Sequence, residues 1–243
     1  MAAVAGSLLL AVAVIGGVGY TVVTVDGADR DAGAPVWKVP KAKAGKAKQA
    51  SAKGLAGTLV PYGADGWNRG PDIGEFGYEA ELSGAHATAL RKESLSGLPR
   101  TQRKALEKQL DKQRLKGVAM RSYVSTEEMA SVYTDKAATV TIELAQMENT
   151  AAVRQVARAQ EAFLDVLADV LREGPRIEGH KDARCFLLPE DDDEKLDSML
   201  CFAHQGNVLV GLTADSAKPM QQKGIAMLLR EQLDRIAEPG EAV

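Results

Sequence analysis

Two short segments, each carrying one of the two cysteines of this 243-residue chain, constrain its fold most tightly. They flank an acidic run, and apolar and polar residues alternate in them with the period of a β-strand. A hairpin centred on Asp193 places Cys185 opposite Cys201. Directly opposed residues have Cβ atoms about 4.5–5.5 Å apart, just beyond the usual range for a disulfide. We expect Cys185 and Cys201 to form a disulfide, and two reduced, buried thiols are the alternative.

A second hairpin follows, with Gly206-Asn207 as its two-residue turn. It places Cys201 on the same face as Ala203, Val210 and Leu212, so we expect the disulfide to lie in the core. A lasting disulfide requires an oxidising compartment. This pairing therefore predicts that the body of the protein lies outside the cytoplasm.

The composition excludes several classes of protein. Three His and two Cys cannot supply a Cys₄ zinc site, an iron–sulfur cluster or a disulfide-dense scaffold. A net charge of −3 and a pI of about 5.7 argue against a chain built to neutralise phosphates. We expect no nucleic-acid partner, no metal and no cofactor.

The first 25 residues, MAAVAGSLLLAVAVIGGVGYTVVTV, contain no ionisable side chain. A helix of that length spans about 37 Å, more than the roughly 30 Å of bilayer hydrocarbon. We expect residues 1–25 to form a transmembrane signal anchor. A cleaved signal peptide is the alternative, because Ala32-Gly33-Ala34 has the small residues that cleavage requires. The lysines downstream would favour a cytoplasmic body, but acidic residues lie nearer the apolar run, and we predict a single-pass cell-membrane protein with an extracytoplasmic body.

Residues 26–57 are rich in Lys and Ala and have almost nothing to bury. We expect them to form a flexible tether. Residues 58–243 then form one extracytoplasmic α+β domain, because patterns with periods of 2 and 3.6 residues alternate along them.

The predicted domain has an antiparallel sheet of about five strands with packed helices. A polar helix opened by Pro99 ends at Gly117. A second helix, capped by Asn149 or Thr150, runs to about Arg172, and the last is capped by Asp215 or Ser216. The second helix buries an apolar stripe of Val153, Val156, Ala157, Phe163, Leu164, Leu167, Val170 and Leu171. The expected strands are Gly117–Ser125, Ala137–Met147, Ala183–Leu188, Ser198–Gln205 and Val208–Ala214.

A Gly/Pro-rich stretch, residues 60–77, holds three aromatic residues, Tyr62, Trp67 and Phe76. It matches neither a P-loop nor a dinucleotide fingerprint. A loop that packs aromatic side chains onto the core would use these residues, and so would the rim of a ligand site.

The polar helix carries the main charge asymmetry of the chain. Residues 91–116 contain nine basic and three acidic residues, whereas residues 117–243 contain thirteen basic and twenty-two acidic ones. We expect this helix to be a candidate surface for anionic lipid or cell-wall polymer. The candidate residues are Arg103, Lys104, Lys108, Lys112 and Lys116.

No known catalytic motif occurs in the chain. A hydrolytic triad would need His86, His180 or His204, and none has a nucleophile at local spacing. The acidic run 190–194 lacks the alternation and the glycine of a calcium loop. We therefore expect no catalytic residues; were the protein an enzyme with a site assembled from distant loops, His180 would be the first residue to mutate.

Three stretches carry a resemblance to a known group: DGWNRGPDIGEFG at 65–77, LPRTQRK at 98–104 and LDRIAEPGEAV at 233–243. With the apolar N-terminus and Lys/Ala spacer, the chain resembles uncharacterised exported, membrane-anchored proteins of high-GC Gram-positive actinobacteria. Its layout is also similar to the disulfide-bonded extracellular sensor domains and surface lipoproteins of such bacteria. The resemblance implies an exported, anchored protein and assigns no functional residue.

The sequence thus favours a non-catalytic, membrane-anchored extracytoplasmic protein that binds an unknown partner or ligand. Docking of the basic helix on anionic lipid or cell-wall polymer is the first alternative. An exported enzyme is the second.

Overall fold

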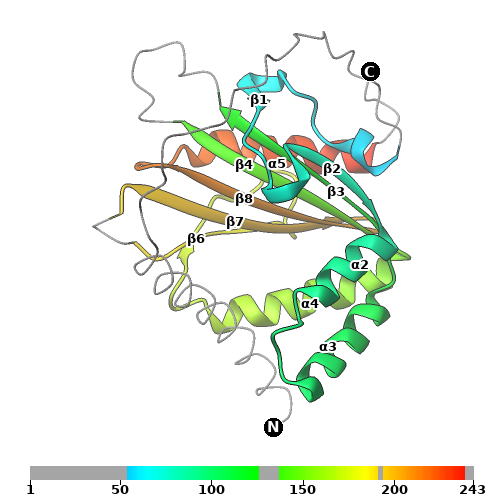
Figure 1. Ribbon diagram of the computed structural model, residues 1–243. Coiled ribbons are helices and arrows are strands. Elements are labelled where there is room, and N and C mark those ends of the chain that lie inside the picture. The colour runs from blue at the N-terminus through cyan, green and yellow to red at the C-terminus, as the bar shows by residue number, and fades with distance from the viewer. Residues whose placement is uncertain (1–53, 126–136, 191–193, 239–243) are drawn as a thin grey trace, which may run out of the picture. The chain divides into compact units, whose positions relative to one another are not determined.

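The sheet is antiparallel throughout, and its strands lie in the order β1-β3-β4-β8-β7-β6-β5, with β2 also paired to β3 (Figure 1). The computed structural model describes residues 54–125, 137–190 and 194–238. Over these residues the predicted α+β class with an antiparallel sheet is confirmed. The strands are β1 Trp67–Arg69, β2 Glu79–Ser83, β3 Leu115–Ser125, β4 Ala138–Met147, β5 Arg172–Glu173, β6 Arg184–Leu187, β7 Leu196–Gln205 and β8 Val208–Ala217.

The sheet has eight strands, so the prediction of about five was wrong. The five expected strands are present as β3, β4, β6, β7 and β8. The other three are short: β1 has three residues, β2 five and β5 two. Segments of two or three residues, such as β5 and β1, are too short for a period-2 pattern to stand out. Strand β2 is one residue longer than β6 and does alternate, so its pattern could have been recognised. All three form because longer neighbours offer them free edges.

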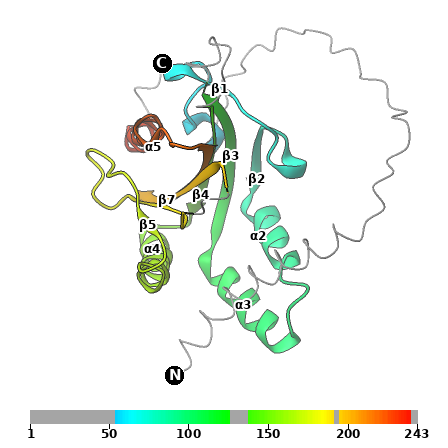
Figure 2. The ribbon, with the colours of Figure 1, turned by 90° about the vertical axis from the view of Figure 1, so that its left-hand side faces the viewer.

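Four α-helices lie in the described residues: α2 Gly84–Glu93, α3 Arg100–Gln113, α4 Thr150–Val166 and α5 Gln222–Ala237. Helix α5 covers one face of the sheet, and α2 and α4 lie against the other (Figures 1 and 2). The main core lies between the sheet and α5, where Ile142 and Leu212 meet Leu229 and Leu233. A smaller cluster forms around Ala87 of α2 on the opposite face.

Three predicted helix boundaries were wrong. Helix α4 begins as expected, since the Asn149 side chain accepts a hydrogen bond from the Ala152 N–H. It ends at Val166 rather than near Arg172, because Arg172 and Glu173 pair with β6. Helix α5 starts only at Gln222, because β8 continues through the predicted cap residues to Ala217.

Helix α3 ends at Gln113, with Arg114 in the left-handed conformation at φ 48°. The predicted terminator Gly117 instead lies in β3, opposite Ser83 of β2. The expected buried stripe of α4 is also narrower than predicted. Val153 and Leu164 are buried, whereas Phe163 is 38% and Val170 57% exposed.

The predicted register around the cysteines is confirmed. Cys185 faces Cys201, and the two form a disulfide with Cα atoms 4.0 Å apart, below the usual 4.4–6.8 Å. Both cysteines belong to the main core cluster, as expected. The turn at Gly206-Asn207 is also as predicted, with Gly206 at φ 58° and Gln205 paired to Val208.

The first described residues pack against the domain. Residues Leu55–Thr58 form a short 3₁₀ helix, and Ala56 within it is 5% exposed. The last residues assigned to the tether therefore belong to the folded domain. The predicted anchor at 1–25 and the tether through residue 53 lie outside the described residues. Within residues 54–125, 137–190 and 194–238, no helix is long and apolar enough to cross a bilayer.

Replacing both cysteines, as C185A/C201A, should lower the free energy of unfolding by about 3 kcal/mol. The disulfide joins two residues that are 16 positions apart, and the chain-entropy model assigns about 3 kcal/mol to closing a loop of that length. Urea unfolding monitored by circular dichroism measures the change. The wild-type protein unfolded in reductant should match the double variant, and a loss below about 1 kcal/mol would contradict the prediction.

Candidate functional site

A cavity of about 940 Å³ lies at the edge of the sheet beside β6. One wall is the segment between β5 and β6. The other walls come from β6, the end of β7, residues 168 and 171 just after α4, and Leu233 of α5. Its size falls within the range typical of small-molecule sites. The lining residues are Ala168, Leu171, Glu173, Gly174, Pro175, Arg176, Ile177, Gly179, His180, Lys181, Asp182, Ala183, Arg184, Cys185, Phe186, Ala203, His204, Gln205 and Leu233.

Helix α5 holds the segment 174–183 in place. The His180 ring Nε2 lies 2.8 Å from Asp234 Oδ1, and Arg230 Nη1 lies 3.0 Å from Glu178 Oε2. Ile177, next to Glu178 in the sequence, is buried in the main core. The wall is therefore attached to the core by one apolar anchor and two polar contacts.

The other attachment of this wall is the disulfide strand. The Gly174 N–H donates to the Cys185 carbonyl at 3.0 Å. A Cβ added at Gly174 would lie 2.7 Å from that carbonyl oxygen, closer than atoms can approach without displacement. The close approach of two backbones explains why glycine stands here. The cavity wall thus leaves the sheet directly beside Cys185.

Charged side chains line the rim of the cavity. Arg184 Nη1 is 3.2 Å from Asp165 Oδ1 of α4. The side chains of Arg176, Lys181, Glu173 and Asp182 have no hydrogen-bond or ion-pair partner among the described residues. The rim therefore presents two cations and two carboxylates that are available to a ligand.

The residues that line the cavity restrict its chemistry. They include no Ser, Thr or Tyr, and Cys185 is held in the disulfide, so they offer no hydroxyl or thiol nucleophile. The described residues contain no group of three His, Cys, Asp or Glu that could hold a metal ion. His180 and His204, far apart in the sequence, both reach this cavity, whereas His86 lies exposed on α2.

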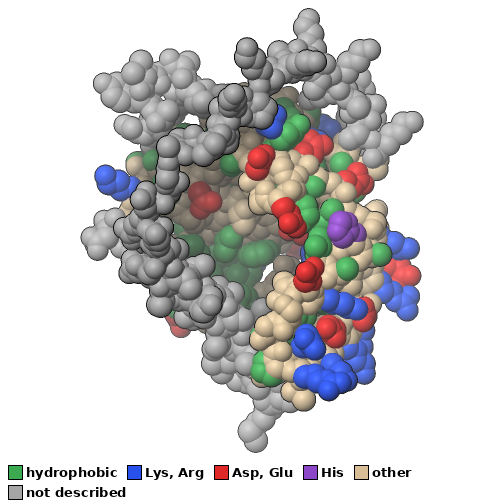
Figure 3. Space-filling view, in the orientation of Figure 1, with side chains coloured by type: hydrophobic (Ala, Val, Ile, Leu, Met, Phe, Trp, Pro, Cys, Tyr) green, Lys and Arg blue, Asp and Glu red, His purple; other side chains and the backbone are tan. Residues whose placement is uncertain are grey.

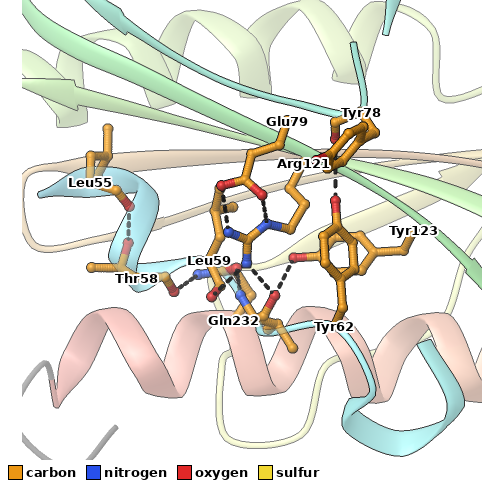
Figure 4. A network of polar contacts seen from close by, with 10 residues as sticks. Leu55, Thr58, Leu59, Tyr62, Tyr78, Glu79, Arg121, Tyr123 and Gln232 are labelled. Carbon is orange, nitrogen blue, oxygen red and sulfur yellow. Dashed lines mark hydrogen bonds and ion pairs between the residues drawn. The ribbon is translucent and has the colours of Figure 1, made fainter. Parts of the chain in front are cut away.

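A separate polar network lies where β3, α5 and the first described residues meet (Figure 4). At its centre is Arg121 of β3, which is 7% exposed. Its guanidinium donates to both carboxylate oxygens of Glu79, at 2.8 and 3.1 Å, and to the Val60 carbonyl at 2.7 Å. The Tyr123 hydroxyl donates to the same carbonyl at 2.8 Å. The network thereby attaches the backbone around Val60 to the sheet.

Gln232 of α5 completes this attachment from the other side. Its side-chain oxygen accepts from the Val60 N–H at 3.1 Å, and its nitrogen donates to the Thr58 carbonyl at 2.8 Å. Each polar group of the network thus finds its partner within the protein. The arrangement is structural, because it stabilises the first described residues against β3 and α5.

The aromatic residues of the Gly/Pro-rich stretch belong to this packing. Trp67 is buried, and Tyr62 packs edge-on against Tyr123 with ring centroids 5.6 Å apart. Phe76 packs against the smaller cluster near α2. Of the two interpretations of residues 60–77, the structure therefore supports aromatic packing onto the core.

The predicted basic residues divide between two elements. Arg103, Lys104, Lys108 and Lys112 lie on α3, and Lys116 lies in β3. None of them reaches the cavity. Arg103 pairs with Glu107 at 3.7 Å.

Sequence reasoning missed the cavity and the Arg121 network. The network left one signal in the sequence. Arg121 lies two residues from both Ala119 and Tyr123, so all three share the face of β3 that the pattern assigns to the core. A cation there requires buried acceptors. The cavity had no comparable signal, because its walls come from segments separated by up to about sixty residues.

Comparisons with known proteins add little. No family model matches this sequence, and no curated protein matches it. Among solved structures, the chain is similar to the extracellular domain of PknH from Mycobacterium tuberculosis, with a TM-score of 0.38 and 9% identity. That match covers 52% of this chain and 66% of the other.

Substitution of Gly174 by Ala should destabilise the protein by about 1–3 kcal/mol, because the new methyl group overlaps the Cys185 backbone. Gly211→Ala is the matched control, since a Cβ there meets nothing within 4 Å. The control should leave the free energy of unfolding unchanged or slightly raised. Equal effects of the two substitutions in thermal and urea unfolding would contradict this account.

Tyr62 should lose its phenolic proton only at unusually high pH. Burial raises its pKa to about 12, although the nearby Arg121 guanidinium opposes the shift. An unfolded Tyr has a pKa of about 10, so the Tyr62 proton stabilises the fold below pH 10, and this contribution disappears as the pH rises through about 12. Phenolate absorbance after a rapid pH jump measures the titration. The titration curve should contain a step near pH 12 that is absent in Y62F and present in Y78F. A step near pH 12 that persists in Y62F would contradict the assignment.

Proposed function

We propose that this protein is a membrane-anchored, extracytoplasmic binding domain that takes a short peptide in the cavity beside β6. The observation that carries the proposal is the cavity itself: about 940 Å³, with a wall fastened to the core and with unpartnered charges on its rim. A wall fixed by His180, Ile177 and Gly174 is preorganised, which lowers the entropic cost of binding.

The disulfide supports an extracytoplasmic location. Structural disulfides persist in oxidising compartments and are rare in the cytosol. The uncharged segment of residues 1–25 supports an anchor, because its length suffices to cross a bilayer.

The charges around the cavity favour a ligand with both a positive and a negative end. Arg176 and Lys181 would pair with a carboxylate, and Glu173 and Asp182 with an amine. The lining also includes the apolar residues Ile177, Ala203 and Leu233. A short peptide with free termini and an apolar side chain has this combination of groups.

Binding is favoured over catalysis by what lines the cavity. The lining residues lack a hydroxyl or free thiol, so an acyl-enzyme formed on Ser, Thr or Cys has no nucleophile there. His180, the residue first considered for an enzyme, is engaged with Asp234 at 2.8 Å and fastens the wall.

Binding can be tested on the full-length protein in detergent with a defined library of tri- and tetrapeptides. Native mass spectrometry should detect bound peptides, and calorimetry should then give their dissociation constants. The charge reversal R176E/K181E should raise the dissociation constant of the tightest-binding peptide at least ten-fold, because the new carboxylates repel the carboxylate of the peptide. The control K195E/K223E changes the net charge equally but lies outside the cavity, and it should bind as the wild type does.

Two outcomes would contradict the proposal. One is a library in which no peptide binds the wild-type protein. The other is binding that R176E/K181E and K195E/K223E weaken equally, because the peptide would then respond to overall charge and not to the cavity.

A further inference from the structure

Helix α3 has no buried residue along its 14 positions. It lies beside α2, and Figures 1 and 2 show the pair at one end of the domain, away from α5. A helix that contributes so little to the core gains little stability from packing. Its composition therefore needs an explanation other than folding.

One side of α3 carries a continuous row of cations. Arg100, Lys104, Lys108 and Lys112 are all exposed and follow one another at intervals of four residues. Such a row extends about 18 Å along one side of a helix. The half-buried Leu106 and Leu110 lie on the opposite side. Figure 3 shows Lys and Arg side chains gathered over the region where Figure 1 places α2 and α3.

No described residue forms an ion pair with this row. Arg100, Lys104, Lys108 and Lys112 have no ion-pair partner among the described residues. The two acidic residues of α3 are engaged elsewhere: Asp111 with Lys92 at 2.6 Å, and Glu107 with Arg103 at 3.7 Å. We call Arg100, Lys104, Lys108 and Lys112 the α3 cation row.

We propose that the α3 cation row docks on a bilayer surface that contains anionic lipid. Four aligned cations on a projecting helix complement a flat anionic surface, where each basic side chain adds to the attraction. Only 28 residues separate the uncharged segment 1–25 from Gly54. Given the anchor at residues 1–25 on which the proposed function rests, a connection of that length keeps the domain close to its own membrane, so the effective concentration of lipid headgroups is high.

Nucleic acid and sugar polymer are less well matched by this helix. Helix α3 contains no Phe, Trp, Tyr or His, so it offers no aromatic ring on which a base or sugar could stack. The whole chain also carries a net charge of −3, which opposes binding to a long polyanion outside the row.

The test uses the full-length protein in nanodiscs of phosphatidylcholine alone or with added phosphatidylglycerol. Acetylation rates of individual lysines, measured by mass spectrometry, report which side chains are covered. Lys104, Lys108 and Lys112 should react at least five-fold more slowly in the anionic discs, and high salt should abolish the difference. Lys223 of α5 should react equally in both.

A pair of matched variants identifies the row as the cause. K104E/K112E retains Lys108 as a reporter, and its reactivity in anionic discs should rise to the neutral-disc value. K195E/K223E has the same change in net charge elsewhere, and Lys108 should stay protected in it.

Two results would overturn the proposal. The first is equal reactivity of Lys104, Lys108 and Lys112 in neutral and anionic discs. The second is protection by soluble poly(glycerol phosphate) in neutral discs without protection in anionic ones, which would assign the row to a wall-type polymer. Neither result bears on peptide binding in the cavity, so the two proposals are tested separately.

Discussion

The disulfide between Cys185 and Cys201 is the constraint on which this end of the domain depends. Strand β6 has only four residues, and only two of them pair with β5 on the side away from β7. A strand of that length has few hydrogen bonds of its own. The covalent link to β7 keeps β6 in register, and the wall of the cavity leaves the sheet at Gly174, directly against Cys185. The disulfide thus fixes the point at which the cavity wall leaves the sheet.

A buried cation has the equivalent role at the other end. Arg121 stands on the core face of β3, where an unpaired charge would be strongly unfavourable. Its partners come from residues 59, 60 and 79, which precede it in the chain. The requirement to satisfy one guanidinium therefore explains why residues 55–62 fold back across the core. Gln232 then ties the same backbone to α5.

The cavity and the α3 cation row lie near opposite edges of the sheet. The cavity borders β6 and β5 at one edge, whereas α3 follows α2, which packs on β3 near the other edge. A domain docked through α3 would therefore leave the cavity open to ligand. Binding and docking would also depend on different side chains, so each can be changed without the other.

The sequence alone determined the class, the five strands β3, β4, β6, β7 and β8, the register that joins Cys185 to Cys201 and the turn at Gly206-Asn207. These features depend on local periodicity and on residues close together in the chain. Only the tertiary structure decided where β1, β2 and β5 form, where α4 ends and where α5 starts. In each case the backbone pairs with a strand that lies beside it in the folded protein. The cavity belongs to this second group. His180, Asp234 and His204 are far apart in sequence, and only packing of α5 against the sheet brings them to one place.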